Sequence, residues 1–503
     1  MNSWIAGKLF HQADEWPHSM PLLDWGHGTD WTVGLGYEGS LHLGASGSGK
    51  TSGGIRPQTV AIMQAGYGVL YLTTKATRPS DSELCWQLAR ESGRENSVVS
   101  MGPTHGLGFN ILRYEMQTAQ ASGQLGDMAA NVACLFSSAA ELAMPNRDTK
   151  GSDHIWRQAV DSLVRHAVSV VFAATHDLRL DDIVSVVKSA PQTLSQVSDP
   201  AWCRESACFQ FIERAAVHND RNIRLARDFF LREFPGYPPD TKNSVLFTFS
   251  AGCADLFQRE PLYSMFFAGT DYTPEIMLDG AILLCDCPVN EYREVGRIAN
   301  GLLRICTQRM LERRGSHPSK RPVAIIWDEC QKTLLGSDVS FQDTARSASC
   351  ATIAAAQNLP ALRHAVGDDL AKAFLGHMRT KVFFQNNDPD TCDYMRRIAG
   401  EKEVRKPTRT RSHDGKVSTT DTFVREDRLP GYAAHNLRTG GAANKGKVTG
   451  FLMVGSKKLR KEEPYQMVCT HQATLRQSLF NYRVHVAAAK RPCPDFRYLR
   501  RVS

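Results

Sequence analysis

The sequence predicts an α/β fold in which a mainly parallel central sheet is interrupted by an all-α insertion. Short continuous apolar runs, typical of buried parallel strands, occur within the first 110 residues and again after residue 280. Between them apolar residues recur at helical spacing, and a glycine-rich loop directly follows an early apolar run. We therefore expect a nucleotide-binding domain split into 1–110 and 259–470, an all-α domain at 111–258, and a basic C-terminal tail at 471–503.

The first part of the chain predicts three buried strands. Residues 1–40 are rich in Gly, Trp and Asp and indicate turns and short strands. Apolar runs at 41–43, 68–73 and 97–100 then follow the pattern of parallel strands. The first of these runs leads straight into the glycine-rich loop, so we expect this strand to position the loop.

A change of character marks the predicted insertion. Segments 127–142, 153–174, 183–187 and 209–230 carry apolar residues at helical spacing and few strand signals. Glycine and prolines at 236–239 punctuate the later part of the insertion. These patterns predict a domain built of helices alone.

Strands alternate with helices again after the insertion. Strands are expected at 281–286, 323–327, 352–356 and 382–384, with a long helix over 292–314. Continuous apolar strands in such an alternation predict a parallel sheet with helices on both faces.

The last fifth of the chain is basic. Residues 401–503 carry 22 Lys and Arg against nine Asp and Glu, whereas the whole chain has a formal net charge of only +8. This imbalance indicates a surface that faces nucleic acid or phosphate, and a solvated basic face is the alternative. Within it we expect a mobile loop at 405–420 and the last strand at 448–454.

Neither a signal peptide nor a membrane span is predicted. The longest apolar run, 167–175, has nine residues, whereas a span needs about 20. The 13 cysteines include no Cys-x-x-Cys pair, which indicates buried thiols in a reducing compartment and no zinc site. We expect a cytoplasmic protein that reaches the inner face of the cell membrane only through a membrane-protein partner.

A phosphate-binding motif occupies residues 44–51. Their sequence, Gly-Ala-Ser-Gly-Ser-Gly-Lys-Thr, fits G-x-x-x-x-G-K-[ST] at every fixed position. In such a loop backbone N–H groups cradle phosphates, the lysine reaches the β- and γ-phosphates, and the hydroxyl ligates Mg²⁺. Because no Asn-Lys-x-Asp motif for guanine occurs, we predict ATP with Mg²⁺. The predicted binding residues are Gly44, Gly47, Ser48, Gly49, Lys50 and Thr51, the last of them also a metal ligand.

Two carboxylates follow the apolar run at 323–327. Asp328 at the strand end is the predicted second metal ligand, and Glu329 the predicted group that polarises the attacking water. An Asp-Glu pair after a strand also occurs as a helix N-cap, but the phosphate-binding motif upstream favours the catalytic interpretation. An adjacent glutamate indicates hydrolysis and motor work rather than phosphoryl transfer to a small molecule.

Three further polar residues are candidates for contacts with phosphate. Gln357 ends the next predicted strand, where it would sense the γ-phosphate and position water, or be an ordinary polar strand end. Arg346 lies 11 residues earlier, as an arginine finger for a neighbouring subunit or as a solvent-facing arginine. Lys75 follows the strand at 68–73 and is either a phosphate contact or a surface lysine.

With these residues in place, the chain resembles the VirD4/TraG/TraD coupling ATPases of conjugation and type IV secretion, within the HerA/FtsK group. The likeness covers about residues 15–470 and rests on both Walker motifs, Gln357 and their order around the helical insertion. Segments 109–110, 153–159 and 381–400 add to it.

The resemblance implies a RecA-like P-loop fold and a homohexameric ring with a central DNA channel. It also implies that the helical domain contacts a relaxase or secretion-machine components, and that Arg346 and Gln357 are the family's finger and sensor. The family usually has an N-terminal membrane anchor, which is not seen here, and Asp-x-Lys where this chain reads Thr73-Thr74-Lys75.

Several functions stay open at this stage. The first is ATP-driven translocation of DNA, expected to be single-stranded, into a secretion machine. The second is an ATP-switched receptor whose helical domain recruits a protein partner, and a third is a soluble DNA motor of a mobile-element or defence system. A small P-loop kinase is disfavoured, because such kinases lack a glutamate after the Walker B aspartate together with a glutamine at the end of the next strand.

Overall fold

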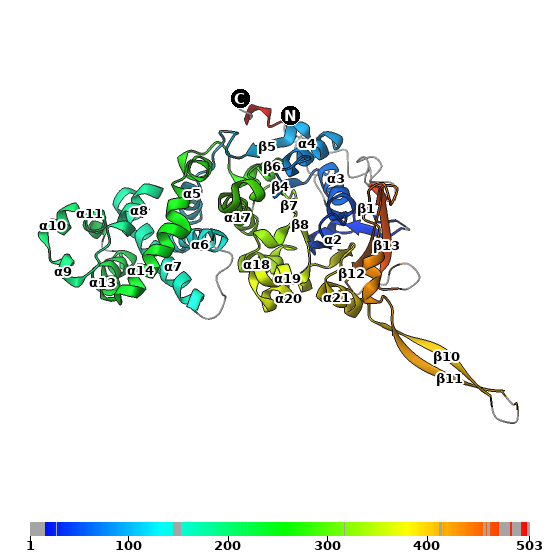
Figure 1. Ribbon diagram of the computed structural model, residues 1–503. Helices are drawn as coiled ribbons and strands as arrows, with labels where there is room; N and C mark the ends of the chain where they lie inside the picture. Colours follow the sequence, from blue (N-terminus) through cyan, green and yellow to red (C-terminus); the bar gives the residue numbers. More distant parts are fainter. Residues whose placement is uncertain are drawn as a thin grey trace.

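The computed structural model combines a sheet-based body, a helical arm and a projecting hairpin (Figure 1). The described residues are 16–26, 28–143, 152–218, 220–315, 317–411, 415, 417–455, 459, 463–471, 483–484 and 494–499. The predicted tail at 471–503 lies mostly outside these residues, and so do the side chains of 153–157.

A nine-stranded sheet forms the body, in the order β13-β12-β9-β3-β8-β7-β4-β6-β5. The seven strands from β9 to β5 run parallel, and β12 and β13 are antiparallel at one edge. The sheet is therefore mainly parallel, as predicted. Its strands are β3 (Ser40–Leu43), β4 (Gly68–Leu72), β5 (Val98–Met101), β6 (Ile282–Cys285), β7 (Val323–Trp327), β8 (Cys350–Ala356), β9 (Thr380–Phe383), β12 (Lys447–Val454) and β13 (Gln466–His471).

Helices cover both faces of the sheet, which explains why its central strands are apolar throughout. Along β4, Leu70 and Leu72 belong to one hydrophobic core, whereas Val69 and Tyr71 belong to the other. Side chains of a strand alternate between the two faces, so each face packs against its own layer. The Val69 layer includes α3 (Arg56–Gln64) and α4 (Asp81–Glu91), and the Leu70 layer includes α17 (Val289–Arg313), α18 (Gly336–Thr344), α19 (Leu359–Val366) and α20 (Asp368–His377).

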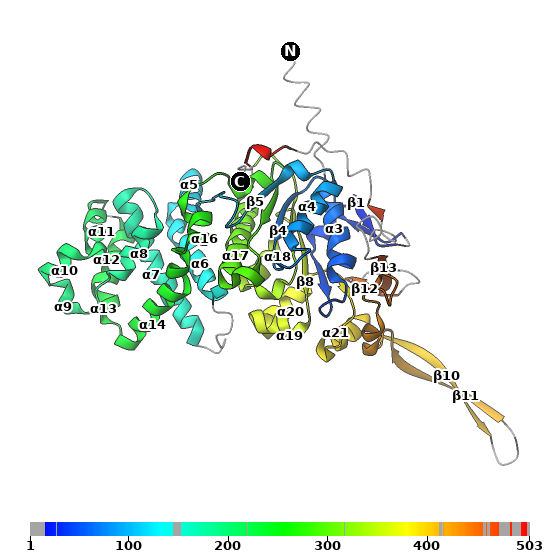
Figure 2. The same ribbon diagram turned by 45° about the horizontal axis from the view of Figure 1, so that its top comes forward.

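The helical arm extends to one side of the sheet in both views (Figure 1 and Figure 2). Stacked and edge-on contacts of Phe136 with Phe249 and Phe257, with ring centroids 6.1 and 5.0 Å apart, lie in its core. Its helices are α5 (Ile111–Ser122), α6 (Leu125–Ala143), α7 (Ser152–Thr175), α8 (Leu180–Lys188), α9 (Leu194–Val197), α10 (Pro200–Glu205), α11 (Ala207–Ala215), α12 (Arg221–Asp228), α13 (Phe234–Gly236), α14 (Pro239–Phe249), α15 (Asp255–Phe257) and α16 (Glu260–Tyr263).

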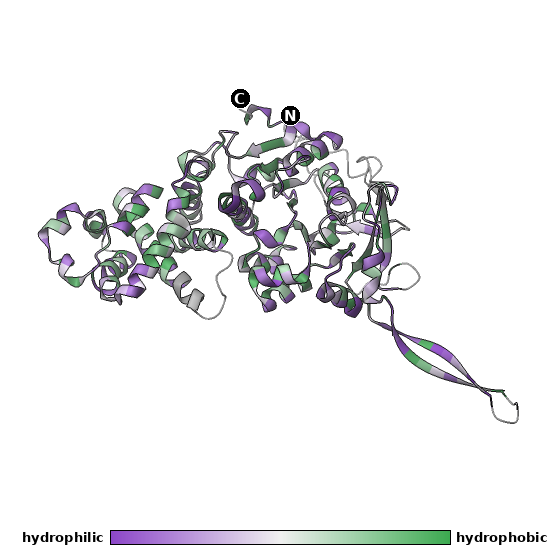
Figure 3. Cartoon of the chain, in the orientation of Figure 1, coloured by the Kyte–Doolittle hydropathy of each residue, from purple (hydrophilic) through white to green (hydrophobic). Residues whose placement is uncertain are grey.

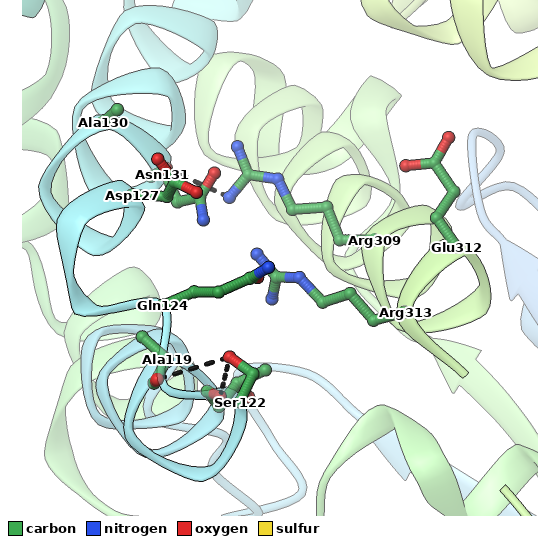
Figure 4. A pocket seen from close by; sticks show the side chains of 10 residues that line it. Ala119, Ser122, Gln124, Asp127, Ala130, Asn131, Arg309, Glu312 and Arg313 are labelled. Carbon is green, nitrogen blue, oxygen red and sulfur yellow. Dashed lines mark hydrogen bonds between the residues drawn. The ribbon is translucent and has the colours of Figure 1, made fainter. Parts of the chain in front are cut away.

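An ion-pair cluster joins the arm to the body. Glu115 on α5 is buried and accepts hydrogen bonds from Arg309 (3.1 Å) and Arg313 (2.8 Å) on α17. Both arginines point across a polar pocket of about 370 Å³ toward Gln124 and Asn131, as Figure 4 shows. Two arginines on one buried carboxylate hold the first helix of the arm against α17.

Two expectations for the C-terminal part are wrong. The expected loop at 405–420 is wrong for residues 405–411 and 417–420, because these belong to the paired strands β10 (Glu401–Arg411) and β11 (Val417–Asp427). Arg, Thr and Gly in this stretch indicate a loop by composition, yet threonine and valine favour strands once they pair. Nor is 448–454 the last strand, since β13 follows it and β14 (Arg483–Val484) pairs with β1 (Pro21–Asp24).

β1 also pairs with β2 (Asp30–Thr32), and α2 (Val33–Tyr37) leads from there to β3. A last helix, α21 (Pro389–Ala399), precedes the hairpin. The green strands of the sheet contrast with the mostly hydrophilic surface helices (Figure 3). Among the helices that the structure describes, none is long and apolar enough to cross a membrane.

Candidate nucleotide-binding site

The predicted site residues follow the ends of adjacent parallel strands. The sheet orders these strands β3-β8-β7-β4, so their carboxyl ends lie at one edge. The motif at 44–51 follows β3, Gln357 follows β8, Asp328 and Glu329 follow β7, and Lys75 follows β4. The topology therefore places Gln357 between the two Walker motifs.

Glycines in the loop after β3 are required by conformation and by space. Gly47 and Gly49 have φ angles of +73° and +92°, which side-chain-bearing residues rarely adopt. A Cβ on Gly49 would also lie 2.4 Å from Val448 Cγ1, and one on Gly44 would lie 2.8 Å from Phe384 Cβ. The backbone of this loop is thus held close to β12 and β9.

Lys50 is buried inside the loop that carries it. Its ammonium group donates hydrogen bonds to the carbonyl oxygens of Gly44 (2.7 Å) and Ala45 (3.1 Å) and lies 3.9 Å from Glu329 Oε1. Burial lowers the pKa of Lys50, although the carboxylates of Glu329 and Asp328 act in the opposite direction. Because the Lys50 ammonium is hydrogen-bonded mainly to neutral carbonyl groups, it is suited to bind an anion.

Thr51 and Asp328 meet as a hydroxyl–carboxylate pair. Thr51 Oγ1 donates to Asp328 Oδ2 at 2.8 Å, and Lys75 Nζ lies 3.4 Å from the same oxygen. Hydroxyl and carboxylate oxygens are the ligands that Mg²⁺ prefers. Partial burial is the largest single influence on the pKa of Lys75 and lowers it, but the carboxylates of Asp328, Asp81 and Glu329 together outweigh burial, and this pKa is raised. Lys75 therefore lies in the site, partly exposed, rather than on a remote surface.

Glu329 is held in an unusual backbone conformation. Its φ of 52° and ψ of 46° are left-handed, which costs a residue with a side chain roughly 1–2 kcal/mol. Its carboxylate accepts hydrogen bonds from the amides of Gln357 (3.0 Å) and Gln331 (2.6 Å). The strained turn directs a carboxylate toward the phosphate-binding loop, and two amides fix its orientation.

Sequence reasoning missed several residues that build the site. Gln331 carries no motif signal, and Asn386 Nδ2 donates to the carbonyl of Gln357 at 2.9 Å. Asp81 accepts from the N–H groups of Thr74 and Lys75, both at 2.7 Å. Burial, and then the charge of Asp328, raise the pKa of Asp81 to about 6. The capping pattern Ser80-x-x-Glu83 is the one signal that pointed to this helix start.

A fully buried ion pair supports the end of β7. Arg304 on α17 pairs with Asp338 at 2.6 Å, and both side chains have zero exposure. The guanidinium also lies 4.0 Å from the centre of the Trp327 ring and donates to Thr333. Trp327 immediately precedes Asp328, so this network fixes the strand from which the two carboxylates project.

His42 packs beneath the phosphate-binding loop. It is fully buried on β3, and its Nε2 lies 2.7 Å from Gln58 Oε1. A Cβ on Gly54 would lie 2.2 Å from His42 Nδ1, so the ring fills the space under the π-helical turn Thr51–Ile55. Burial lowers the pKa of His42 to about 4, and the ring is therefore neutral at neutral pH.

Arg346 is not brought to the site of its own chain. It lies between α18 and the start of β8, exposed, with Nη1 3.6 Å from Glu38. Gln357 follows the other end of β8, and the seven residues of that strand separate the two by about 20 Å. A guanidinium side chain cannot span that distance within one subunit.

The residues present fit a bound phosphate chain and a divalent cation. Ser48 Oγ is buried and has no hydrogen-bond partner among the described residues, and the Lys50 ammonium lies in the same loop. The hydroxyl of Thr51 and the carboxylate of Asp328 supply hard oxygens beside it. Gln357 and Glu329 face this position from the neighbouring strand ends.

Comparison with known proteins identifies one segment that matches a protein family, and solved structures with the same fold. Residues 322–431 match the family described as the TraM recognition site of TraD and TraG. None of the curated protein sequences matches the chain significantly.

Solved structures of a bacterial conjugative coupling protein, TrwB, have the same fold. The unbound TrwBΔN70 matches with a TM-score of 0.60 and 14% identity over 92% of this chain and 91% of that one. TrwB with ADP and Mg²⁺ matches with a TM-score of 0.59 and 14% identity over 92% and 91%. TrwB with the GTP analogue GDPNP gives 0.58 and 14% over 97% and 94%. The predicted RecA-like fold and the resemblance to coupling ATPases are thereby confirmed, as a likeness of fold and of one segment.

Proposed function

We propose that this protein is an ATP-hydrolysing motor of the coupling-protein type that moves DNA into a conjugation or type IV secretion machine. The observation that carries the proposal is the convergence of Lys50, Thr51, Asp328, Glu329 and Gln357 at one edge of the sheet. TrwB, which has the same fold, is a coupling protein and binds ADP with Mg²⁺. The basic C-terminal fifth supports a polyanionic cargo.

The chain's own residues account for the chemistry of hydrolysis. Gly44, Gly47, Ser48, Gly49 and Lys50 hold the phosphates of ATP. Glu329 orients a water molecule and withdraws its proton, and Gln357 keeps the Glu329 carboxylate aimed at the phosphate edge.

Thr51 and Asp328 would hold Mg²⁺, which when bound neutralises charge on the phosphate oxygens. The salt bridge of Lys75 to Asp328 lies beside this position and reduces the negative charge there. We therefore propose that Lys75 acts by partly neutralising Asp328.

Replacing Lys50 with Ala and Glu329 with Gln tests the proposal and separates two steps. Lys50→Ala removes the buried cation and should abolish both nucleotide binding and hydrolysis. Glu329→Gln keeps the size and the amide contacts but cannot take a proton, so it should bind ATP normally and hydrolyse it about 10²–10⁴ times more slowly. Binding of a fluorescent ATP analogue and steady-state phosphate release measure the two effects. Full hydrolysis by Glu329→Gln would remove Glu329 from the mechanism.

The working assembly is proposed to be a homohexamer in which Arg346 completes the neighbouring site. The roughly 20 Å between Arg346 and Gln357 within one chain supports this assignment, because only another copy can bring the guanidinium to the phosphate edge. An arginine finger supplied by a second subunit contributes about 10³–10⁵ in rate. Single-stranded DNA is the proposed cargo.

A second candidate function is recruitment of a protein partner, a relaxase or a secretion-machine component. The matched segment 322–431, whose family is described by TraM recognition, supports it. That segment lies in the body and hairpin, whereas sequence reasoning assigned recruitment to the helical arm. Pull-down of purified relaxosome proteins by the full chain, with and without residues 401–427, would decide which part recruits.

The domain division remains our proposal: a motor domain of 1–110 and 259–470, a helical domain of 111–258 and a basic tail of 471–503. In the structure the arm continues past residue 258 through α16 to the π-helical turn Ser264–Ala268. Limited proteolysis with mass spectrometry of the fragments tests where the boundaries lie.

A further inference from the structure

Within the part of the chain that the structure describes, the β10–β11 hairpin is exposed along most of its length. It projects from the body in two views (Figure 1 and Figure 2). Each strand has 11 residues, so the hairpin extends about 35 Å. Isolated two-stranded hairpins are only marginally stable in water, and a partner that binds this hairpin would stabilise it.

Charge is divided along the hairpin. Its outer half, 405–411 with 417–423, carries four basic residues against one acidic residue. Its base, 401–404 with 424–427, carries two basic against four acidic residues. The hairpin therefore presents positive charge away from the body and negative charge next to it, which suits an anionic partner at the outer half.

One face of the outer half gathers the arginines. Arg405, Arg409 and Arg411 occupy alternate positions of β10 and share a face, and Arg405 lies opposite Phe423 in the register. Arg405 pairs with Asp421, but within the described part of the chain Arg409 and Arg411 have no ion-pair partner. These two are about 7 Å apart along the strand, and Arg409 lies about 14 Å along it from Arg405. The Phe423 side chain, opposite Arg405, is 63% exposed.

We propose that this arginine face binds the phosphate backbone of DNA and that an unpaired base stacks on Phe423. The inference rests on the proposed DNA-handling function and assigns a contact to it. Guanidinium groups match phosphate oxygens in bidentate geometry. An exposed aromatic ring next to cations is the combination that holds single strands without regard to sequence. Hydroxyl-bearing Thr408, Thr410, Thr420 and Thr422 occupy the opposite face.

The test is equilibrium binding of a fluorescent oligonucleotide, single-stranded or duplex, to the full chain without nucleotide over a range of salt concentrations. The double variant Arg409→Ala/Arg411→Ala should bind single strands at least about tenfold more weakly, and the slope of log K against log salt should fall by about 1.4. Arg409→Lys/Arg411→Lys should largely restore binding. Phe423→Ala should weaken single-strand binding more than duplex binding.

Lys402→Ala is the matched control, because it removes one charge from the acidic base of the same hairpin and should leave affinity nearly unchanged. Equal single-strand affinity of the wild type and the double arginine variant would overturn the inference while leaving the motor proposal intact. A change in oligomeric state of that variant with unchanged DNA affinity would overturn it too, and would assign the hairpin to contacts between copies. If the wild type bound no DNA at all, the proposed function itself would fall.

Discussion

At the scale of single residues, the site is built from buried charges that face one another. Lys50, Asp328 and Glu329 are each no more than 6% exposed. Buried charges are tolerated only when they are paired or hydrogen-bonded, and here three different strand ends supply the partners. An anion bound at the loop would offset the burial that lowers the pKa of Lys50. The buried ammonium of Lys50 thus favours a negatively charged ligand.

His42 should make the stability of the fold depend on pH. Its pKa is about 4 in the folded protein and near 6.5 in an unfolded chain, so between these values only the unfolded chain takes up the proton. The free energy of unfolding should therefore fall as pH falls from 6.5 toward 4, by up to about 3 kcal/mol from this residue. Above pH 6.5 the residue contributes no further change.

Urea unfolding of wild type and His42→Gln between pH 7 and 4.5 measures this effect, because this range covers most of the interval between the unfolded and folded pKa values of His42. The variant should show the shallower dependence on pH. His435→Gln, at an exposed position, controls for the loss of a histidine. Parallel pH profiles for wild type and His42→Gln would contradict the account of a neutral, buried ring beneath the loop.

The Walker residues could be predicted from sequence because each is defined by a short local pattern with a fixed place on a strand. Gln331, Asn386 and Asp81 could not, because their roles arise from contacts between segments far apart in the chain. The left-handed backbone at Glu329 also has no sequence signal, since the residue is not glycine. A local sequence pattern cannot predict a role that a polar residue acquires only through tertiary contacts.

At the scale of elements, α17 connects the parts of the molecule. Its Arg304 fixes the end of β7 through Asp338 and Trp327, while Arg309 and Arg313 on the same helix hold α5 through Glu115. One rigid helix thus contacts both the Walker B strand and the first helix of the arm.

Removing one partner of the Arg304–Asp338 pair should be costly. Arg304→Met leaves a buried carboxylate without its cation, which destabilises proteins by about 3–5 kcal/mol. Arg397→Met, which breaks the exposed pair of Arg397 with Asp393, should cost less than about 1 kcal/mol. Denaturant unfolding of both variants gives the comparison. Equal losses of unfolding free energy in the two variants would mean that burial does not make the Arg304–Asp338 pair more important for stability than an exposed pair.

The strands and helices that build the site could be predicted, whereas the hairpin and the edge strands could not. β4, β7 and β8 are continuous apolar runs, and burial on both faces explains that pattern. β10 and β11 are exposed on both faces, so no apolar alternation marks them. Their pairing is held by hydrogen bonds between the two strands, which composition does not reveal.

At the scale of the whole molecule, the proposed arginine finger lies away from the phosphate-binding loop of its own chain. Arg346 and its neighbour Glu38 lie at the end of the sheet away from the phosphate-binding loop. In the proposed ring of identical subunits, this edge of one subunit would face the site of the next, and every subunit would both give and receive an arginine. The proposal of a ring therefore depends on a catalytic role for Arg346.

Mixing two inactive variants tests this geometry. Arg346→Ala keeps an intact phosphate site, and Lys50→Ala keeps an intact arginine, so mixed rings contain some complete sites. ATP hydrolysis by the mixture should exceed that of either variant alone by at least about tenfold, given the roughly 10³-fold contribution of a finger. Lys50→Ala mixed with Glu329→Gln is the control, because both lesions fall in the same site and cannot complement. No gain in the first mixture would place Arg346 outside catalysis.

The central claim is that ATP hydrolysis in this chain is coupled to DNA through a ring of subunits. Its most direct test is steady-state ATP hydrolysis with and without single-stranded and double-stranded DNA, over a range of salt concentrations, for wild type and Arg346→Ala. The account predicts that DNA stimulates hydrolysis, that stimulation declines as salt rises, and that Arg346→Ala loses it. Hydrolysis that is indifferent to DNA and equal in the two proteins would contradict the account.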